Sequence, residues 1–122
     1  MSTEDRYDAL FKALGHRARR RMLDLLKDGP MTTGALCDAL PDSDRCTVMQ
    51  HLKVLESAQL VVVERRGRER WNHLDALPFH DIQQRWTGPY AAHALNMLAQ
   101  LKHGLEGETA PDANITEKAA GT

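Results

Sequence analysis

Hydrophobic residues recur at helical spacing through the first third of the chain. Between residues 5 and 14 they lie three and four positions apart, which predicts an amphipathic helix. A second helix is predicted over residues 16–28, because Gly29-Pro30 directly after it is a common helix stop. A third, short helix is expected to follow, with Thr32 or Thr33 as its N-cap. The buried stripe predicted for the second helix is Met22, Leu25 and Leu26.

Residues 44–58 predict a fourth helix with two different faces. Asp44 (or Ser43) is placed to cap its N-terminus. Apolar side chains four and three positions apart form the face expected to be buried, namely Val48, Leu52 and Leu55. The opposite face carries side chains at i, i+3, i+4 and i+7, namely Cys46, Met49, Gln50 and Lys53. This opposite face is the one expected to meet a ligand.

A β-hairpin rich in arginine is predicted directly after this helix. Two strands, 61–65 and 69–73, are joined by a turn that contains Gly67. Arg66 and Arg68 flank the glycine, and Arg70 lies on the returning strand. A helix of the width of the DNA major groove, followed by a basic ribbon, is the arrangement of a winged helix-turn-helix. The predicted fold class is therefore mainly α with a small β-hairpin, and the predicted function is binding to double-stranded DNA.

The C-terminal third predicts two more helices and a tail. The helical pattern returns over residues 78–86, and Gly88-Pro89 interrupts it. The last helix is expected over residues 90–105, and its stripe is more apolar than a small monomer needs. Residues 106–122 are polar and aperiodic, which predicts a disordered acidic tail. Residues 1–105 are thus expected to form one domain for DNA binding and dimerisation.

Charge is distributed unevenly along the chain, which matters more than the net charge of -1. Six basic and three acidic residues fall between residues 45 and 70, a balance of +3. Residues 103–122 have four acidic residues and one lysine, a balance of -3. The acidic N-terminus lacks an apolar signal core, no stretch is apolar enough to span a bilayer, and only 2 Cys are present. We therefore expect a cytoplasmic protein with free thiols.

Three motifs resemble the ArsR family, the arsenic-repressor type of winged helix-turn-helix regulators. LFKALGHRARRRMLDLL (residues 10–26) looks like the family's opening signature. TVMQHLKVLESAQLV (47–61) resembles its recognition helix, and RRGRERWNHL (65–74) resembles its wing. The motifs cover residues 5–86, and taken together they are specific. The segment at residues 85–106 is similar to a branch with an extended last helix and no obvious metal site.

The resemblance implies a homodimer joined by its first and last helices. Such a dimer binds a pseudo-palindromic operator and represses transcription until an effector releases it. The residues expected at the dimer interface are Tyr7, Leu10, Phe11, Ala91, Ala94, Leu95, Leu98 and Leu101. The residues expected at DNA are Arg45, Cys46, Thr47, Met49, Gln50, Lys53, Arg66, Arg68 and Arg70. Neither the effector nor the operator is predicted.

The expected DNA contacts follow from the chemistry of each side chain. Gln50 can form two hydrogen bonds with adenine, Met49 can pack on a thymine methyl, and Thr47 can reach a base or the backbone. Lys53 and the wing arginines suit phosphate or minor-groove contact. The family often has a Ser-Arg pair where this chain has Met49-Gln50, so no operator sequence carries over. His51 is interpreted as a packing histidine, and Arg19 to Arg21 as a scaffold that pairs with neighbouring acids.

No cofactor or metal ion is predicted. Metal-sensing relatives carry Cys-x-Cys on the third helix, whereas here Cys37 is followed by Ala39 at the second position. On the last helix, His103 and Glu106 match half of the family's zinc motif, but Ala92 replaces the histidine of the other half.

Two alternatives to the repressor remain open, and an enzyme is disfavoured. The first is a winged-helix module for protein interaction that has lost DNA binding. The second is a thiol-responsive repressor, in which oxidation of Cys46 weakens DNA binding, since the helix N-terminus and Arg45 favour its thiolate. The chain shows no nucleophile–base pair, Gly-rich phosphate loop or paired carboxylates, so we expect no enzymatic activity.

Overall fold

The computed structural model describes residues 2–88 and 92–108 of the chain. It contains two compact units, Met1–Asp81 and Ile82–Thr122. Each unit is described by itself. Within the described residues, no helix is both long and apolar enough to cross a membrane.

The first unit contains four helices whose ends follow from local capping. The helices are α1 (Thr3–Leu14), α2 (Arg17–Leu26), α3 (Thr33–Ala39) and α4 (Arg45–Ser57). Ser2 and Asp5 form a capping box at the start of α1, and the His16 ring accepts a hydrogen bond from the amide of Ala18. Thr32 caps α3 and Asp44 caps α4, which confirms both predicted positions.

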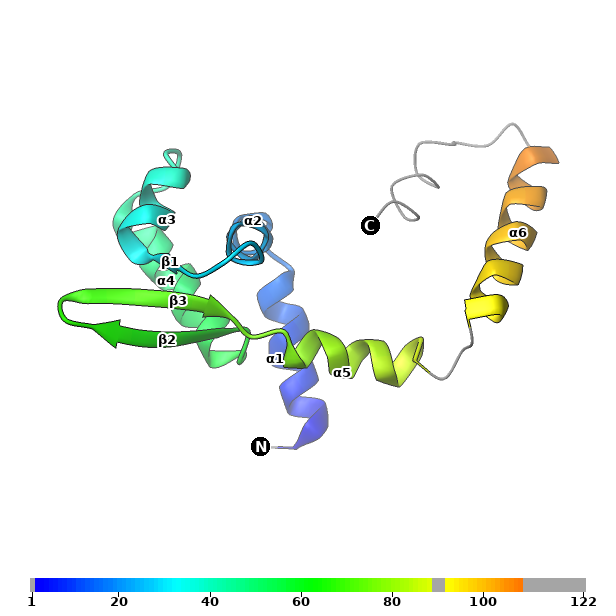
Figure 1. The fold of residues 1–122 in the computed structure, drawn as a ribbon, viewed down its shortest axis with the longest axis horizontal. Coiled ribbons are helices and arrows are strands. Elements are labelled where there is room, and N and C mark those ends of the chain that lie inside the picture. Colours follow the sequence, from blue (N-terminus) through cyan, green and yellow to red (C-terminus); the bar gives the residue numbers. More distant parts are fainter. Residues whose placement is uncertain (1, 89–91, 109–122) are drawn as a thin grey trace. The chain divides into compact units, whose positions relative to one another are not determined.

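A three-stranded antiparallel sheet completes the first unit (Figure 1). The predicted hairpin is present as β2 (Val61–Arg66) and β3 (Glu69–Leu74), each one residue longer than expected. Gly67, at φ 61°, occupies the left-handed region that the tight turn requires. The unexpected strand β1 (Met31–Thr32) pairs with β3, so the sheet order is β1-β3-β2. Two residues are too few to show an alternating pattern in the sequence. This strand is defined by its backbone pairing with β3.

The core of the first unit is built from the helices and the start of β2. Leu23 is buried on α2, whereas Leu25 is half-buried, which corrects the predicted stripe by one member. The buried apolar side chains are Leu10, Ala13, Met22, Leu23, Leu26, Leu36, Leu40, Val48, Leu52, Leu55, Ala58, Leu60 and Val61. They lie in α1 to α4, at the C-cap of α3, in the turn after α4 and at the first residue of β2. The recognition helix is therefore seated in the core of this unit.

Two arginines of α2 bind the C-terminal carbonyls of α1. Arg19 donates from Nε to the carbonyl of Ala13 at 2.7 Å, and Arg20 donates from Nη1 to that of Leu14 at 2.7 Å. Carbonyls in the last turn of a helix lack intrahelical partners and carry partial negative charge. The scaffold role predicted for these arginines is confirmed, but they bind carbonyl oxygens and not the neighbouring acids.

A histidine and its cationic neighbours connect α2 to α4. His51 on α4 lies with its Nδ1 3.3 Å from Nη1 of Arg19, and its ring is 4.5 Å from that of His16. Burial lowers the pKa of His51, and the positive charges of His16 and Arg19 lower it further. His51 is therefore the packing and hydrogen-bonding residue that the sequence indicated.

Asn72 is a buried polar contact between the sheet and α3. Its side chain is fully buried in β3 and donates from Nδ2 to the carbonyl of Met31 at 3.2 Å and to Oγ1 of Thr33 at 3.1 Å. Thr33 is itself buried. Because a buried N–H group must be hydrogen-bonded to avoid a desolvation penalty, the two bonds from Nδ2 hold β1 and the start of α3 against β3.

The remaining helices are α5 (Leu77–Trp86), which begins in the first unit, and α6 (Ala92–Glu108) in the second. The apolar side chains of α6 are largely exposed, and they include Leu95, Met97, Leu98, Leu101 and Leu105. The helix ends at Glu108, so residues 106–108, expected in the tail, are helical. The rest of the predicted tail and the expected start of this helix at residues 90 and 91 lie outside the described residues.

Replacement of Asn72 with alanine is expected to destabilise the fold by about 2 kcal/mol, because it removes two hydrogen bonds and leaves Thr33 Oγ1 buried without this partner. Urea unfolding measures the change. The matched control is Asn96→Ala on the exposed surface of α6, which should change stability by less than about 0.5 kcal/mol. Equal effects of the two substitutions would contradict the assigned role.

The stability of the fold is expected to decrease as pH falls from 7 toward 5. His51 has a lowered pKa in the folded chain, so the unfolded chain, with a histidine pKa of about 6.5, takes up the proton first. The contribution of His51 is therefore complete above that value and is lost as pH falls through the folded pKa. His51→Gln keeps an acceptor for Arg19 without the titration, so its unfolding free energy should depend less steeply on pH. An unchanged slope would argue against this assignment.

Candidate nucleic-acid interface

Core packing sets which side of α4 faces outward. Val48, Leu52 and Leu55 are each 0% exposed, as the sequence predicted. Four of the six α4 residues expected at DNA are exposed, namely Arg45, Cys46, Gln50 and Lys53, and the other two, Thr47 and Met49, are half-buried. The helix therefore presents a polar surface opposite its buried stripe.

The N-terminus of α4 is stabilised by an ionised cap. Oδ1 of Asp44 accepts a hydrogen bond from the amide of Thr47 at 2.7 Å. The hydrogen bonds from Thr47 lower the pKa of Asp44, so the cap is a carboxylate at neutral pH. This contact fixes the first turn of α4, where Arg45 and Cys46 are exposed.

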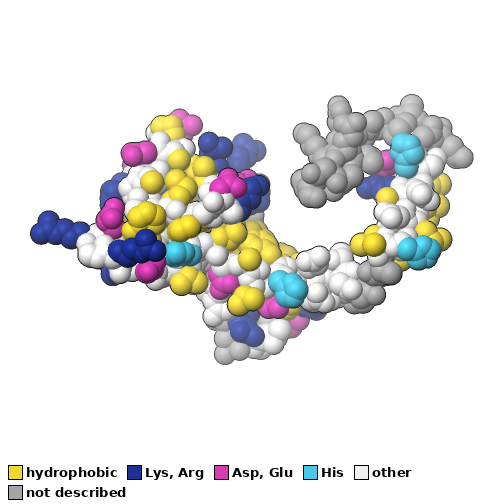
Figure 2. Space-filling model, in the orientation of Figure 1, with side chains coloured by type: hydrophobic (Ala, Val, Ile, Leu, Met, Phe, Trp, Pro, Cys, Tyr) yellow, Lys and Arg dark blue, Asp and Glu magenta, His cyan; other side chains and the backbone are white. Residues whose placement is uncertain are grey.

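The arginines of the hairpin, in contrast, have different environments. Basic side chains gather at its closed end (Figure 2), but Arg66 and Arg70 have acidic partners. Arg66 pairs with Glu64 at 2.8 Å and lies with its guanidinium carbon 4.9 Å from the centre of the Trp71 ring. Arg70 has only 20% of its side chain exposed and pairs with Glu56 of α4 at 3.2 Å.

Glu64 is the acidic group that organises the outer face of the hairpin. It accepts a hydrogen bond from Arg66 and lies 2.9 Å from Nε2 of His73. The hydrogen bond from Arg66, followed by that from His73, lowers the pKa of Glu64. The carboxylate therefore stays ionised and neutralises part of the positive charge of Arg66.

Arg68 and Arg65 are the remaining cations at the tip of the hairpin. Both are exposed, and among the residues that the structure describes, no side-chain hydrogen bond or ion pair involves either of them. Arg65 lies two positions after Val63 and four after Val61, so its side chain is on the same face of the strand as theirs. That is the face that packs toward the helices. Sequence reasoning did not assign Arg65 a role, although the two-residue period of the strand was the available signal.

A groove of about 850 Å³, including its open mouth, runs between α1 and α4. Gln50 and Lys53 line it from α4, and Lys12 lines it from α1. The sequence placed the two α4 residues on the outward face but assigned nothing to Lys12, because the contact between these helices is tertiary. Lys12 therefore brings another cation to the edge of the outward face of α4.

The described part of the chain contains no group of three or more His, Cys, Asp or Glu residues arranged to hold a metal ion. Cys37 is half-buried and Cys46 is exposed, and both are free thiols.

The outward face of α4 and the arginine side chains of the hairpin together form the surface that the sequence predicted. Their side chains suit contact with the phosphates and base edges of DNA.

Comparisons with known proteins agree with this geometry. A helix-turn-helix domain family matches residues 14–64. The HTH-type transcriptional regulator Rv2034 of Mycobacterium tuberculosis is 38% identical over 105 residues, covering 83% of this chain and 92% of that protein. The solved structure of an ArsR family transcriptional regulator has a TM-score of 0.60 and 27% identity, covering 64% of this chain and 85% of its own.

A further solved structure shows the same fold. It is the homodimeric winged helix-turn-helix DNA-binding domain Mb0332 from Mycobacterium bovis, with a TM-score of 0.55 and 24% identity, covering 73% of this chain and 89% of that one. The agreement with the family is more than a likeness of fold. The chain is 38% identical to Rv2034, and it has a capped helix α4 followed by a basic hairpin. The chain therefore belongs to the ArsR family of winged helix-turn-helix transcriptional regulators.

Proposed function

We propose that the chain is a homodimeric repressor that binds a pseudo-palindromic operator, is released by an effector and has no enzymatic activity. The observation that carries the proposal is the polar face of α4 beside the basic hairpin, both positioned by one hydrophobic core. In a winged helix-turn-helix such a helix enters the major groove and the wing contacts the adjacent backbone.

Base recognition is assigned to the exposed middle of α4. Gln50 is exposed and can form paired hydrogen bonds with adenine, and the half-buried Met49 leaves part of its side chain for a thymine methyl. Lys53, one turn further on, and Lys12 across the groove suit phosphates. Arg45, Cys46 and Thr47 occupy the first turn, where the helix N-terminus favours an anion.

The wing arginines are proposed to divide into different roles. Arg68 is exposed and suits direct contact with phosphate or the minor groove. Arg66 must share its charge with Glu64, so its contribution to DNA binding is smaller. Arg70 joins the hairpin to α4 through Glu56 and is assigned to positioning the wing. This division narrows the set of DNA contacts that the sequence predicted.

Dimerisation is assigned to the exposed apolar residues of α1 and α6. Phe11 is 46% exposed and stacks on Tyr7, while Leu95, Leu98 and Leu101 are 42%, 53% and 60% exposed. Ala94 is half-buried on the same helix, and Ala91 lies outside the described residues. Leu10 is 4% exposed in the core of its own chain, so we leave it out of the proposed interface.

The dimer is proposed to place two copies of α4 in successive major grooves. The homodimeric relative from Mycobacterium bovis supports the dimer itself. The operator half-sites are then expected about one helical turn, roughly 34–36 Å, apart.

Replacement of Arg68 with alanine is expected to reduce the salt dependence of DNA binding by about 0.9 in the slope of log K per protomer, because one phosphate contact is lost. Fluorescence anisotropy with the DNA upstream of the protein's own gene, at several salt concentrations, measures the slope. The matched control is Arg70→Ala, which should lower stability through the lost Glu56 contact and leave the slope nearly unchanged. Absence of binding to that DNA and to random duplexes by the parent chain would refute the proposed function.

Replacement of Gln50 with alanine is expected to relax base preference at one position in each half-site. The loss of a paired hydrogen bond should reduce discrimination there by about 1–3 kcal/mol. Selection from a random duplex library, with sequencing of the bound fraction, compares the variant with the parent. Ser57→Ala, at the exposed C-terminal end of α4, should retain the parent's preference. Identical selected sequences for the Gln50 variant would exclude base reading by this residue.

A further inference from the structure

A hollow in the first unit lies apart from the outward face of α4. It has a volume of about 420 Å³, including its mouth, and is formed by α1, the turn after α4 and the first turn of α5. One face of α1 lines it with residues at i, i+3, i+4 and i+7, namely Thr3, Arg6, Tyr7 and Leu10. The enclosed part of the hollow is about 80 Å³, which leaves room for several water-sized groups and therefore only for a small ligand.

The base of the hollow is apolar. Leu10 is 4% exposed and Ala58 is 8% exposed, so both belong to the core as well as to the wall. Pro78, half-buried at the start of α5, adds a further apolar surface. These three small or medium side chains suit a short aliphatic group.

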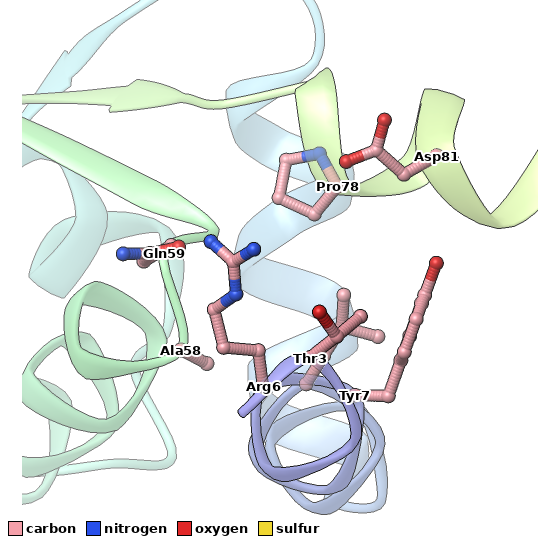
Figure 3. Close-up of a pocket in the computed structure, with 8 residues that line it drawn as sticks. Thr3, Arg6, Tyr7, Ala58, Gln59, Pro78 and Asp81 are labelled. Carbon is pink, nitrogen blue, oxygen red and sulfur yellow. The ribbon is translucent and has the colours of Figure 1, made fainter. Parts of the chain in front are cut away.

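Opposite charges stand on facing walls of this hollow. Figure 3 shows the guanidinium of Arg6 reaching in from α1 and the carboxylate of Asp81 reaching in from α5. In the described part of the chain neither forms an ion pair within 4.0 Å, with each other or with another residue. The hydroxyl of Tyr7 lies on the Asp81 side, and Thr3 adds a second hydroxyl near Arg6 (Figure 3).

This separation of charge selects the class of ligand. A simple anion attracted to Arg6 meets the repulsion of Asp81, and a simple cation attracted to Asp81 meets that of Arg6. A molecule that carries a carboxylate and an ammonium group on one carbon can bind both side chains. The Arg6 guanidinium binds its carboxylate through paired hydrogen bonds, and the Asp81 carboxylate binds its ammonium. With the apolar base, the complementary shape is that of a small α-amino acid.

We propose that this hollow is a binding site for a free α-amino acid with a short aliphatic side chain, its carboxylate on Arg6 and its ammonium on Asp81. The hydroxyl of Thr3 lies near Arg6 and offers a further hydrogen bond. The ligand rests on the turn at Gln59, which has φ 64° and ends the recognition helix. The proposal concerns binding alone, so its failure leaves the proposed DNA-binding function intact.

Isothermal titration of the full chain with L-alanine, L-valine and L-leucine tests the site. At least one of the three is expected to bind saturably. For L-valine, the analogues that lack one charge are isobutylamine, without the carboxylate, and 3-methylbutanoate, without the ammonium. Each analogue is expected to bind at least about tenfold more weakly than the zwitterion. Failure of all three amino acids, or equal binding of the analogues, would overturn the proposal.

The assigned residues are tested by removing one charge at a time. Arg6→Met and Asp81→Asn should each weaken amino-acid binding at least about tenfold, with thermal unfolding used to confirm that the variants fold. The matched controls are Arg17→Met on α2 and Asp8→Asn on α1, both exposed and outside the hollow. If the Arg6 and Asp81 variants bind as the parent does, the assignment is wrong. If they change the dimerisation constant while no amino acid binds, the hollow is a contact between protomers and the proposal is also wrong.

Discussion

The interface depends on the fixed orientation of α4 about its own axis. Val48, Leu52 and Leu55 are completely buried, so the helix cannot turn without exposing apolar surface to water. One residue on a helix corresponds to about 100° of rotation, and a shift of that size would remove Gln50 and Lys53 from the outward face. The hydrophobic core thereby decides which polar side chains are available to DNA.

Several cations of this chain are used to hold the fold together. Arg19 and Arg20 bind the last carbonyls of α1, and Arg70 binds Glu56 across the hairpin and α4. The first two contacts supply donors to carbonyl oxygens at the end of α1 that lack intrahelical partners, and the third connects the hairpin to α4. The number of basic residues in a segment is therefore a poor measure of its contacts with DNA. The environment of each guanidinium is the better guide.

The balance of charge on the hairpin follows the same logic. Glu64 stays ionised between Arg66 and His73, and Arg66 lies against the Trp71 ring. The outer face of the wing is thus nearly neutral at Glu64 and Arg66. The exposed cations Arg65, on the opposite face, and Arg68, in the turn, have no acidic partner among the described residues. A field concentrated at the tip favours contact with a phosphate backbone that passes the end of the hairpin.

Local patterns in the sequence were enough to predict the four helices of the first unit, the hairpin turn and the buried stripe of α4. They narrowed the caps of α3 and α4 to two residues each, and the structure selects Thr32 and Asp44. These features depend on periodicity and capping within a few residues, which one sequence displays directly. Other features depended on the tertiary structure. The pairing of β1 with β3, the Asn72–Thr33 contact, the Arg70–Glu56 pair and the approach of Arg6 and Asp81 to one hollow each join separate elements. The burial of Leu23 in place of Leu25 depends on which face of α2 the neighbouring elements cover. The sequence alone determined which surfaces are apolar or charged, whereas their partners were decided by packing, because only the folded core brings distant segments within hydrogen-bonding distance.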